Sequence, residues 1–469
     1  ERIPFEQAAA NGQIICCQEE VDAAYLAAVK AQSLGGPRSL KVIYSPLHGV
    51  GASAVMPALR ADGFDDVELF APHAEPNGDF PNVPGHVSNP ENPQVFDAII
   101  ERGQQSGAEL ILASDPDCDR IGLAAPLVRQ RGAKWATLSG NQIGALLADY
   151  ILSRRRALGT LSPRSYVVKT LVTTELIARI AESYGVRVCG ALQVGFKYIG
   201  GTMDAEGAND FVFGAEESHG YLVGQYARDK DAAVSAMLLA ELAAEAKAKG
   251  QTMHERLDAL YWQHGCHAER QVSVTMPGSE GMQAMAALIA RFRAQPPEKI
   301  AGMGVMRVDD YQSLRRLEAG GKWARFDGPP GDMVMLYLDR KGTYVAVRPS
   351  GTEPKVKYYM FAFEPAEQLH NLDDARAAAC EISCDGFADA GGGPGDDGDA
   401  VVERVGHARG YARGVSMHAA TCRRGRLRLE RKPPSAGGSR RERACLARHE
   451  VSLSTERGCS RGAKGTGLG

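Results

Sequence analysis

Over residues 38–265 the pattern of hydrophobic and polar positions indicates short strands that alternate with helices along the chain. Short apolar runs have the length of buried strands, and between them apolar side chains recur at helical spacing. Strand patterns lie at residues 40–44, 67–70, 109–113, 165–170, 186–189 and 211–213, and helix patterns at 51–62, 95–102, 139–153, 173–184 and 232–248. This order predicts two α/β modules, each with a parallel sheet and crossover helices.

The pattern changes after about residue 266. Strand patterns follow at residues 270–276, 333–338, 343–347 and 356–363, with a helix pattern at 281–293. The strands at 333–338 and 343–347 are predicted to pair across a charged loop that ends in Gly342. A smaller α+β domain is expected here.

We therefore predict an α/β protein in which two tandem α/β modules are followed by a small α+β domain and a disordered C-terminal tail. The predicted segments are a connector with one helix (1–37), the first module (38–131), the second module (132–265), the α+β domain (266–384) and the tail (385–469). The tail is rich in Arg, Gly and Ser and has few aliphatic residues, so it cannot bury enough apolar surface to offset the entropy lost on ordering.

Composition narrows the class of protein. The 469 residues, 44% of them hydrophobic, exclude a disulfide miniprotein and a collagen. No apolar run is long enough to predict a membrane span, so no membrane partner is expected. The ten cysteines contain no CxxC pair, which predicts reduced thiols and a cytoplasmic location. The first residues lack an initiator Met and a signal-peptide layout, and we expect the sequence to begin partway through a longer protein.

The formal net charge of −3 hides an asymmetry. Residues 404–469 carry 16 Lys or Arg and 4 Asp or Glu, and the rest of the chain has an excess of 15 acidic residues. The acidic part argues against a nucleic-acid partner. The basic tail fits an arm that binds phosphate backbones. We favour a frameshifted tail instead, because only Lys432 and Lys464 among its basic residues are Lys, as GC-rich DNA read out of frame would give.

Three carboxylates, Asp115, Asp117 and Asp119, occupy every second position directly after a predicted strand. Such a turn can converge hard oxygen ligands on one Mg²⁺, and open α/β sheets bind their ligands where strands end. Arg120 beside them suits an anionic substrate, because its planar guanidinium grips phosphate. A solvated acidic turn is the alternative. An EF-hand is excluded, because Arg120 and Pro126 stand where that loop needs Gly and Glu.

Two further loops carry groups that could bind a sugar phosphate. Side-chain donors and a Gly that frees backbone N–H groups suggest a phosphate-cradling turn, with an ordinary hairpin loop as the alternative. Its members are Arg348, Ser350, Gly351, Thr352 and Lys355. Glu216 and Ser218, after the strand at 211–213, can hydrogen-bond vicinal sugar hydroxyls, with a plain polar loop as the alternative. Lys197 is either a solvated Lys or an acid/base.

A different interpretation rests on residues 49–54, which fit the GxGxxA pattern of a dinucleotide fingerprint between a strand and a helix. Residues 45–48 separate the strand from the first Gly, where the fingerprint needs a tight turn. We therefore favour an ordinary strand-to-helix turn, and a dinucleotide-dependent oxidoreductase stays an alternative.

Taken in this order, the motifs resemble those of the α-D-phosphohexomutase family, which comprises phosphoglucomutases and phosphomannomutases. The resemblance covers about residues 11–363 and rests on residues 45–49, 115–120, 194–197, 214–220 and 348–355, with family-like stretches at 80–83, 89–91 and 228–231. It implies a four-domain family fold, with the metal loop in domain two, the sugar loop in domain three and the phosphate loop in domain four.

The family resemblance also makes one feature of this sequence unusual. Family members transfer phosphate from a phosphoserine in domain one, in a stretch like Thr-Ala-Ser-His-Asn-Pro, and the sequence holds no such stretch. Ser88 lies in the nearest match, at 87–90, which belongs to the domain-two stretch. We expect the chain to lack the N-terminal phosphoserine domain and to be inactive alone.

By resemblance, the full enzyme interconverts hexose 1-phosphate and hexose 6-phosphate through a sugar bisphosphate, which also serves as activator. The resemblance implies that Asp115, Asp117 and Asp119 bind Mg²⁺, Arg120 contacts the transferring phosphoryl group and Lys197 is the acid/base. It further implies that Glu216 and Ser218 hold the sugar, while Arg348, Ser350, Gly351 and Thr352 clamp the other phosphate, assisted by Lys355. The Glu-Glu-Ser form of the sugar loop favours glucose over mannose. We expect a monomer or dimer, and a non-catalytic sugar-phosphate-binding protein is the alternative.

Overall fold

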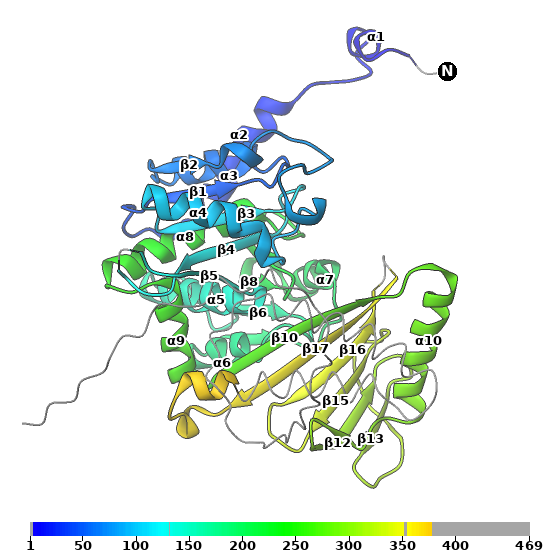
Figure 1. The fold of residues 1–469 in the computed structure, drawn as a ribbon. Helices are drawn as coiled ribbons and strands as arrows, with labels where there is room; N and C mark the ends of the chain where they lie inside the picture. Colours follow the sequence, from blue (N-terminus) through cyan, green and yellow to red (C-terminus); the bar gives the residue numbers. More distant parts are fainter. Residues whose placement is uncertain (1–2, 131, 351–353, 378–469) are drawn as a thin grey trace, which may run out of the picture. The chain divides into compact units, whose positions relative to one another are not determined.

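The structure is a computed structural model that describes residues 3–130, 132–350 and 354–377 (Figure 1). The predicted tail at 385–469 lies outside the described residues, as do residues 378–384 of the predicted α+β domain. The described residues belong to one compact unit. Among them, no helix combines the length and the apolar character that crossing a membrane requires.

The first module contains a five-stranded sheet with the strand order β2-β1-β3-β4-β5, whose last strand comes from the start of the residues predicted for the second module. Its elements are β1 (Val42–Ser45), α3 (Ala52–Ala61), β2 (Val67–Leu69), α4 (Asp97–Ser106), β3 (Leu110–Ser114), β4 (Ile121–Pro126) and β5 (Trp135–Leu138). Strands β1, β2 and β3 are parallel as predicted, but β4 and β5 are antiparallel. The sheet thus gains two antiparallel strands that were not predicted, because the short acidic turn returns the chain beside β3 without a crossover helix.

The second module repeats this design with a four-stranded sheet in the order β7-β6-β8-β9. Its strands are β6 (Tyr166–Lys169), β7 (Arg187–Cys189), β8 (Phe211–Ala215) and β9 (Tyr221–Val223), and its helices are α5 (Gly140–Ala157), α6 (Glu175–Ser183), α7 (Phe196–Glu206), α8 (Ala232–Ala248) and α9 (Met253–His264). The last strand is again antiparallel to its neighbour. Helix α7 escaped prediction because Gly200 and Gly201 weaken its helix propensity.

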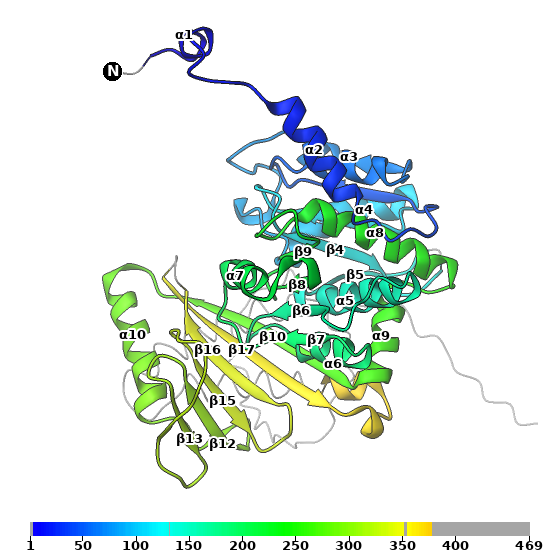
Figure 2. The same ribbon diagram turned by 180° about the vertical axis from the view of Figure 1, so that it is seen from behind.

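Helix α8 joins the two modules. It is buried along almost its whole length, and its many alanines let neighbouring backbones pack closely on every side. It packs against α3 of the first module and β9 of the second (Figure 2). One continuous hydrophobic core runs from Val42 of β1 to Phe213 of β8 through this helix. The two modules are thus one structural body with a shared core.

The third sheet belongs to the predicted α+β domain and has the main strand order β10-β17-β16-β15-β12-β13-β14. Its elements are β10 (Cys266–Thr275), α10 (Gly278–Ala294), β11 (Lys299–Ile300), β12 (Met303–Asp310), β13 (Arg315–Glu318), β14 (Ala324–Arg325), β15 (Val334–Leu338), β16 (Tyr344–Pro349) and β17 (Lys355–Glu364). Helix α10 packs on β15 and β16 (Figure 1). The predicted pairing of residues 333–338 with 343–347 is confirmed, with Val334 opposite Val347.

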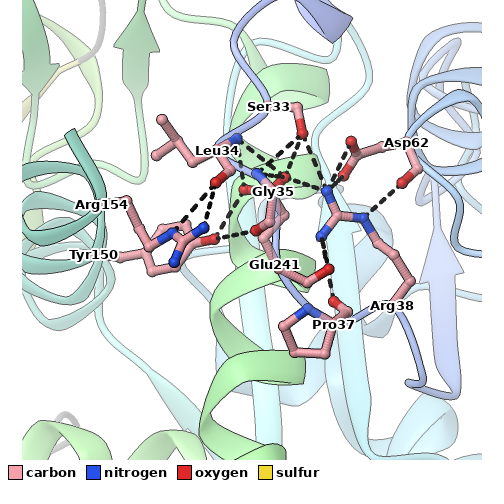
Figure 3. A network of polar contacts seen from close by, with 10 residues as sticks. Ser33, Leu34, Gly35, Pro37, Arg38, Asp62, Tyr150, Arg154 and Glu241 are labelled. Carbon is pink, nitrogen blue, oxygen red and sulfur yellow. Dashed lines mark hydrogen bonds and ion pairs between the residues drawn. The ribbon is translucent and has the colours of Figure 1, made fainter. Parts of the chain in front are cut away.

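Short helices complete the described chain. Two precede the first sheet, α1 (Phe5–Ala10) and α2 (Gln18–Lys30), and five are 3₁₀ turns at Ala71–His73, Pro84–His86, Pro93–Phe96, Ala208–Asp210 and Ala366–Gln368. The connector after α2 is held by a polar network around Glu241 of α8 (Figure 3). Because Arg38 in this network also pairs with Asp62, directly after α3 of the first module, the connector is bound to both modules.

Candidate functional site

The three predicted metal ligands converge. Oxygen atoms of Asp115, Asp117 and Asp119 all lie within 4.8 Å of one another, in the loop that joins β3 to β4. Asp115 is buried, Asp119 is half-buried and Asp117 is exposed. Carboxylate oxygens on one side and access to water on the other are what Mg²⁺ requires, because this ion retains several water ligands. The donor set therefore fits the predicted ion.

Asp115 organises the backbone of this loop. Its Oδ1 accepts hydrogen bonds from the backbone N–H of Asp119 at 3.1 Å and of Arg120 at 2.9 Å. Cys118 takes the left-handed conformation, with a φ of 61°, which a non-Gly residue adopts only when its surroundings impose it. The loop is thus a tight turn closed on its own first carboxylate.

Two cations stand beside the three carboxylates. Arg120 donates from Nε to Oδ2 of Asp115 at 2.6 Å and from Nη1 to Oε1 of Glu91 at 3.0 Å. Lys230 places Nζ 2.6 Å from Oδ2 of Asp119. Burial raises the pKa of Asp115 to about 6, and the Arg120 guanidinium opposes this rise. Arg120 therefore lies at the metal loop as predicted, while the contact of Lys230 is new.

Gly49 and Gly51 let another segment approach the metal loop. A Cβ atom on Gly49 would lie 2.2 Å from Cα of Pro116, and one on Gly51 would lie 2.2 Å from the hydroxyl oxygen of Tyr44. The backbone N–H of Val50 donates to the carbonyl of Pro116 at 2.9 Å. Close packing on the metal loop thus accounts for the glycines of the GxGxxA pattern without a dinucleotide.

The sugar loop lies directly beside the metal loop. Its residues Glu216 and Ser218 connect β8 to β9, and His219 is left-handed with a φ of 68°. The backbone N–H of Ile121 donates to the carbonyl of His219 at 3.0 Å, and Arg120 pairs with Gly220 in an antiparallel bridge. Loops of the two modules are therefore joined through their backbones.

Glu216 connects the sugar loop to the segment that carries Lys197. Its Oε1 accepts a hydrogen bond from the backbone N–H of Gly195 at 2.8 Å, immediately before α7. Burial raises the pKa of Glu216, and the nearby Lys230 opposes the rise. Lys197 itself is exposed, with Nζ 5.0 Å from the centroid of the Tyr198 ring. The structure thus brings the start of α7 to the sugar loop.

The phosphate loop lies between β16 and β17. Arg348 belongs to the end of β16, and the backbone N–H of Ser350 donates to the carbonyl of Lys355 at 2.8 Å, which closes the loop at its base. The predicted residues Gly351 and Thr352 lie outside the described residues. Arg348 is half-buried and lies close enough to Tyr359 of β17 to oppose the rise that burial causes in the pKa of that phenol.

Four residues at these loops were not singled out from the sequence: Glu91, Glu217, Lys230 and Tyr359. Glu91 and Lys230 lie in stretches that resembled the family, but nothing in their local pattern showed that they would pair with Arg120 and Asp119. Tyr359 looks like any core residue of a strand. Only the long-range packing of three sheets brings these side chains to the site.

Comparison with known proteins follows the same division of the chain. Residues 23–127 match the family model for the alpha/beta/alpha domain II of phosphoglucomutase/phosphomannomutase. Residues 139–264 match domain III of that family, and residues 303–379 match its C-terminal domain. The chain belongs to the phosphoglucomutase/phosphomannomutase family of α-D-phosphohexomutases. The family resemblance seen in the sequence is confirmed.

Individual relatives agree with this family. A phosphoglucomutase of Staphylococcus haemolyticus is 33% identical over 322 residues, which are 68% of this chain and 57% of that protein. One from Staphylococcus aureus strain MRSA252 is 31% identical over 327 residues, or 69% of this chain and 57% of that protein. The chain therefore spans less than two thirds of the length of the curated relatives it matches.

Solved structures show the same fold. The pp63/parafusin phosphoglucomutase of Paramecium, in its open form, superposes with a TM-score of 0.51 at 15% identity, over 82% of this chain and 62% of that chain. A phosphoglucomutase/phosphomannomutase family protein of Burkholderia thailandensis gives a TM-score of 0.50 at 18% identity, over 77% of this chain and 64% of that chain.

Proposed function

We propose that this chain carries the metal, sugar and phosphate sites of a cytoplasmic phosphohexomutase that interconverts hexose 1-phosphate and hexose 6-phosphate through a sugar bisphosphate. The junction of the metal loop with the sugar loop carries this proposal. The backbone bond between Ile121 and His219 places the three carboxylates beside the loop of Glu216 and Ser218. A transferring phosphoryl group and the sugar that receives it would meet at this junction.

Each part of the site has a role in this proposal. Mg²⁺ held by Asp115, Asp117 and Asp119 would neutralise charge on the transferring phosphoryl group. Arg120 has a guanidinium already positioned by Asp115 and Glu91, and it would donate to the same phosphoryl oxygens. Lys197 would take or return the proton of the reacting sugar hydroxyl.

The sugar and the distal phosphate would be held by the other two loops. Glu216 accepts and Ser218 both donates and accepts hydrogen bonds, so together they fit neighbouring sugar hydroxyls in either orientation of the bisphosphate. The phosphate that is not transferred would be bound by Arg348, Ser350, Gly351, Thr352 and Lys355. The Glu-Glu-Ser form of the sugar loop supports glucose over mannose as the preferred sugar, and the phosphoglucomutases among the relatives support the same choice.

Binding and turnover need separate measurements. We expect the full 469-residue chain to bind glucose 1,6-bisphosphate in the presence of Mg²⁺, as measured by calorimetry, and to bind mannose 1,6-bisphosphate more weakly. We expect no turnover of glucose 1-phosphate by the chain alone, because its sequence holds no phosphoserine stretch. Absence of binding to either bisphosphate would contradict the proposed site. Turnover by the chain alone would contradict only the missing nucleophile.

A matched pair of variants tests the phosphate loop. Replacing the guanidinium in Arg348→Gln should weaken bisphosphate binding about tenfold or more, because one charge-assisted contact to phosphate is lost. The control is Arg164→Gln, since Arg164 is an exposed residue that pairs with Asp210 at the start of β8, the end of that strand opposite to the sugar loop. Equal affinities for the two variants would exclude Arg348 from the site.

A further inference from the structure

Glu217 lies between the two proposed sugar ligands in the sequence, but its side chain lines a cavity next to the sheet of the α+β domain. It lines a cavity of about 70 Å³ with Glu269 of β10 and Tyr359 of β17. The cavity therefore separates the sugar loop of the second module from the sheet of the α+β domain. Glu217 has 8% of its surface exposed and Tyr359 has 2%, so both side chains are withdrawn from bulk water.

Both side chains keep a polar atom unused. Oε2 of Glu217 and the hydroxyl of Tyr359 are buried, and neither has a hydrogen-bond partner among the described residues. An unpaired buried polar group destabilises the folded state, so such groups are normally satisfied by protein or by ordered water. A cavity of about 70 Å³ has room for ordered water, since one water needs only about 10–15 Å³ of such space. Water in the cavity that both residues line would satisfy both atoms.

Tyr359 also connects this cavity to the phosphate loop. In the register of β16 and β17, Ala346 stands opposite Tyr359 and Arg348 stands opposite Lys357. Opposite residues share a face of a sheet, and so do residues two apart in one strand, so Arg348 and Tyr359 lie on one face. Burial raises the pKa of the Tyr359 phenol well above its ordinary value; the Glu217 carboxylate adds to this rise and the Arg348 guanidinium opposes it. The phenol is therefore within reach of both charges.

The same face of the sheet packs on the second module. Tyr359, Phe361 and Tyr344 form a hydrophobic cluster with Val172, which follows β6. This apolar contact holds the sheet of the α+β domain against the second module, and the polar cavity shares Tyr359 and Phe361 with it.

We propose that Glu217 and Tyr359 are positioning residues that couple the sugar loop to Arg348 through their contact at this cavity. The inference rests on the proposed function, in which the two loops hold the two ends of one sugar phosphate. Glu216 and Ser218 flank Glu217, so holding its carboxylate orients both ligands. Tyr359 in turn limits where Arg348 can lie. The contact sets the span between the sugar hydroxyls and the distal phosphate.

The contact depends on pH through Glu217. Burial raises the pKa of Glu217 to about 7, the Glu216 carboxylate adds to the rise and Lys357 opposes it. Several titratable and charged groups surround it. Glu216 and His219 belong to its own loop, and Glu91 comes from the first module. The α+β domain contributes Glu269 and Arg270 from β10, Arg348 from β16, and Lys357 and Tyr359 from β17. The ionised carboxylate is the stronger acceptor, so the contact is strong above about pH 7 and weakens as the pH falls.

The test is calorimetric titration of the full chain with glucose 1,6-bisphosphate at saturating Mg²⁺, at pH 6 and pH 8. At pH 8 we expect Glu217→Gln and Tyr359→Phe each to weaken binding about tenfold, and the double variant to be no weaker than either, because the two residues act as one unit. At pH 6 Glu217→Gln should match the unsubstituted chain. The control is Tyr358→Phe, since Tyr358 lies on the opposite face of β17 in a different core cluster and should bind normally.

The outcomes separate this inference from the proposed function. Additive losses, or a loss that is the same at both pH values, overturn the coupling while leaving the sugar-phosphate site intact. An unsubstituted chain that binds no bisphosphate overturns both. Unfolding midpoints should stay within a few degrees of the unsubstituted chain, since both substitutions nearly conserve volume. If Tyr359→Phe does not fold, the pH dependence of binding by Glu217→Gln tests the inference. If Glu217→Gln does not fold, the affinity of Tyr359→Phe at pH 8 tests it.

Discussion

Arg38 places its Nη2 atom 2.6 Å from Oε1 of Glu241, and this pair joins the connector after α2 to the middle of α8 (Figure 3). Glu241 is completely buried, and its carboxylate also accepts hydrogen bonds from the backbone N–H of Leu34 at 3.1 Å and from the hydroxyl of Tyr150 at 2.9 Å. A buried carboxylate is tolerated only when such partners replace its water. This network therefore supports the core that the two modules share.

Replacing this carboxylate should destabilise the protein strongly. We expect Glu241→Gln to lower the free energy of unfolding by about 3–5 kcal/mol, because Arg38 and the backbone donors would lose their common charged acceptor. Urea unfolding measures the change. Glu68→Gln is the control, since Glu68 pairs with Arg102 at the surface, where solvent screens an ion pair and leaves it little effect on stability. Equal losses in the two variants would contradict a special role for the network.

Asp117 offers a clean test of the metal site because it is exposed. Asp117→Asn should weaken Mg²⁺ binding about tenfold or more, since it removes one of the three charged oxygen ligands. The free energy of unfolding should change by less than about 0.5 kcal/mol, as for most surface substitutions. Calorimetric titration with Mg²⁺ checks the affinity. Asp204→Asn, at an exposed position of α7, should bind the ion as the unsubstituted chain does.

Gly49→Ala tests the role of the glycine-rich turn. The added methyl group would meet the backbone of Pro116, so we expect a loss of about 1–3 kcal/mol in stability together with weaker Mg²⁺ binding. Gly78→Ala is the control, because a Cβ atom there has nothing within 4 Å. NAD⁺ should give no heat of binding with the unsubstituted chain. A binding signal that disappears in Gly49→Ala would instead support the dinucleotide interpretation.

His267 of β10 should make the stability of the protein depend on pH. Burial, and then the positive charge of Arg179, lower its pKa from 6.5 to about 3. Below about pH 6.5 His267 binds a proton in the unfolded chain but not in the folded protein. The free energy of unfolding is therefore highest above this pH and decreases as the pH falls to about 3. Between pH 7 and pH 5 the loss from this group should be roughly 2 kcal/mol.

Urea unfolding at pH 5, 6 and 7 measures this dependence. His267→Gln should flatten the curve, because Gln does not titrate in this range. His86→Gln is the control, since His86 is exposed and should leave the curve unchanged. A curve that keeps its slope in His267→Gln would assign the dependence to other groups.

Local pattern was sufficient for most elements of the fold and for the convergence of the three carboxylates. The spacing of Asp115, Asp117 and Asp119 after a strand predicted that their carboxylates converge, because a short turn between paired strands leaves alternate side chains close together. Strands β4 and β5 were missed, since their mixed small and apolar residues resemble a loop as much as a strand. The spacing of apolar residues also does not predict that β4 pairs antiparallel with β3.

The sequence by itself determined the alternation of strands and helices, the family and the residue types at the metal, sugar and phosphate loops, because these depend on neighbours along the chain. Tertiary structure decided which of these loops meet. Ile121 and His219 bond to one another across 98 positions, and Glu217 faces Tyr359 across a cavity that belongs to two sheets. Such contacts follow from how whole helices and sheets pack around a shared core, and side-chain periodicity carries no record of that packing.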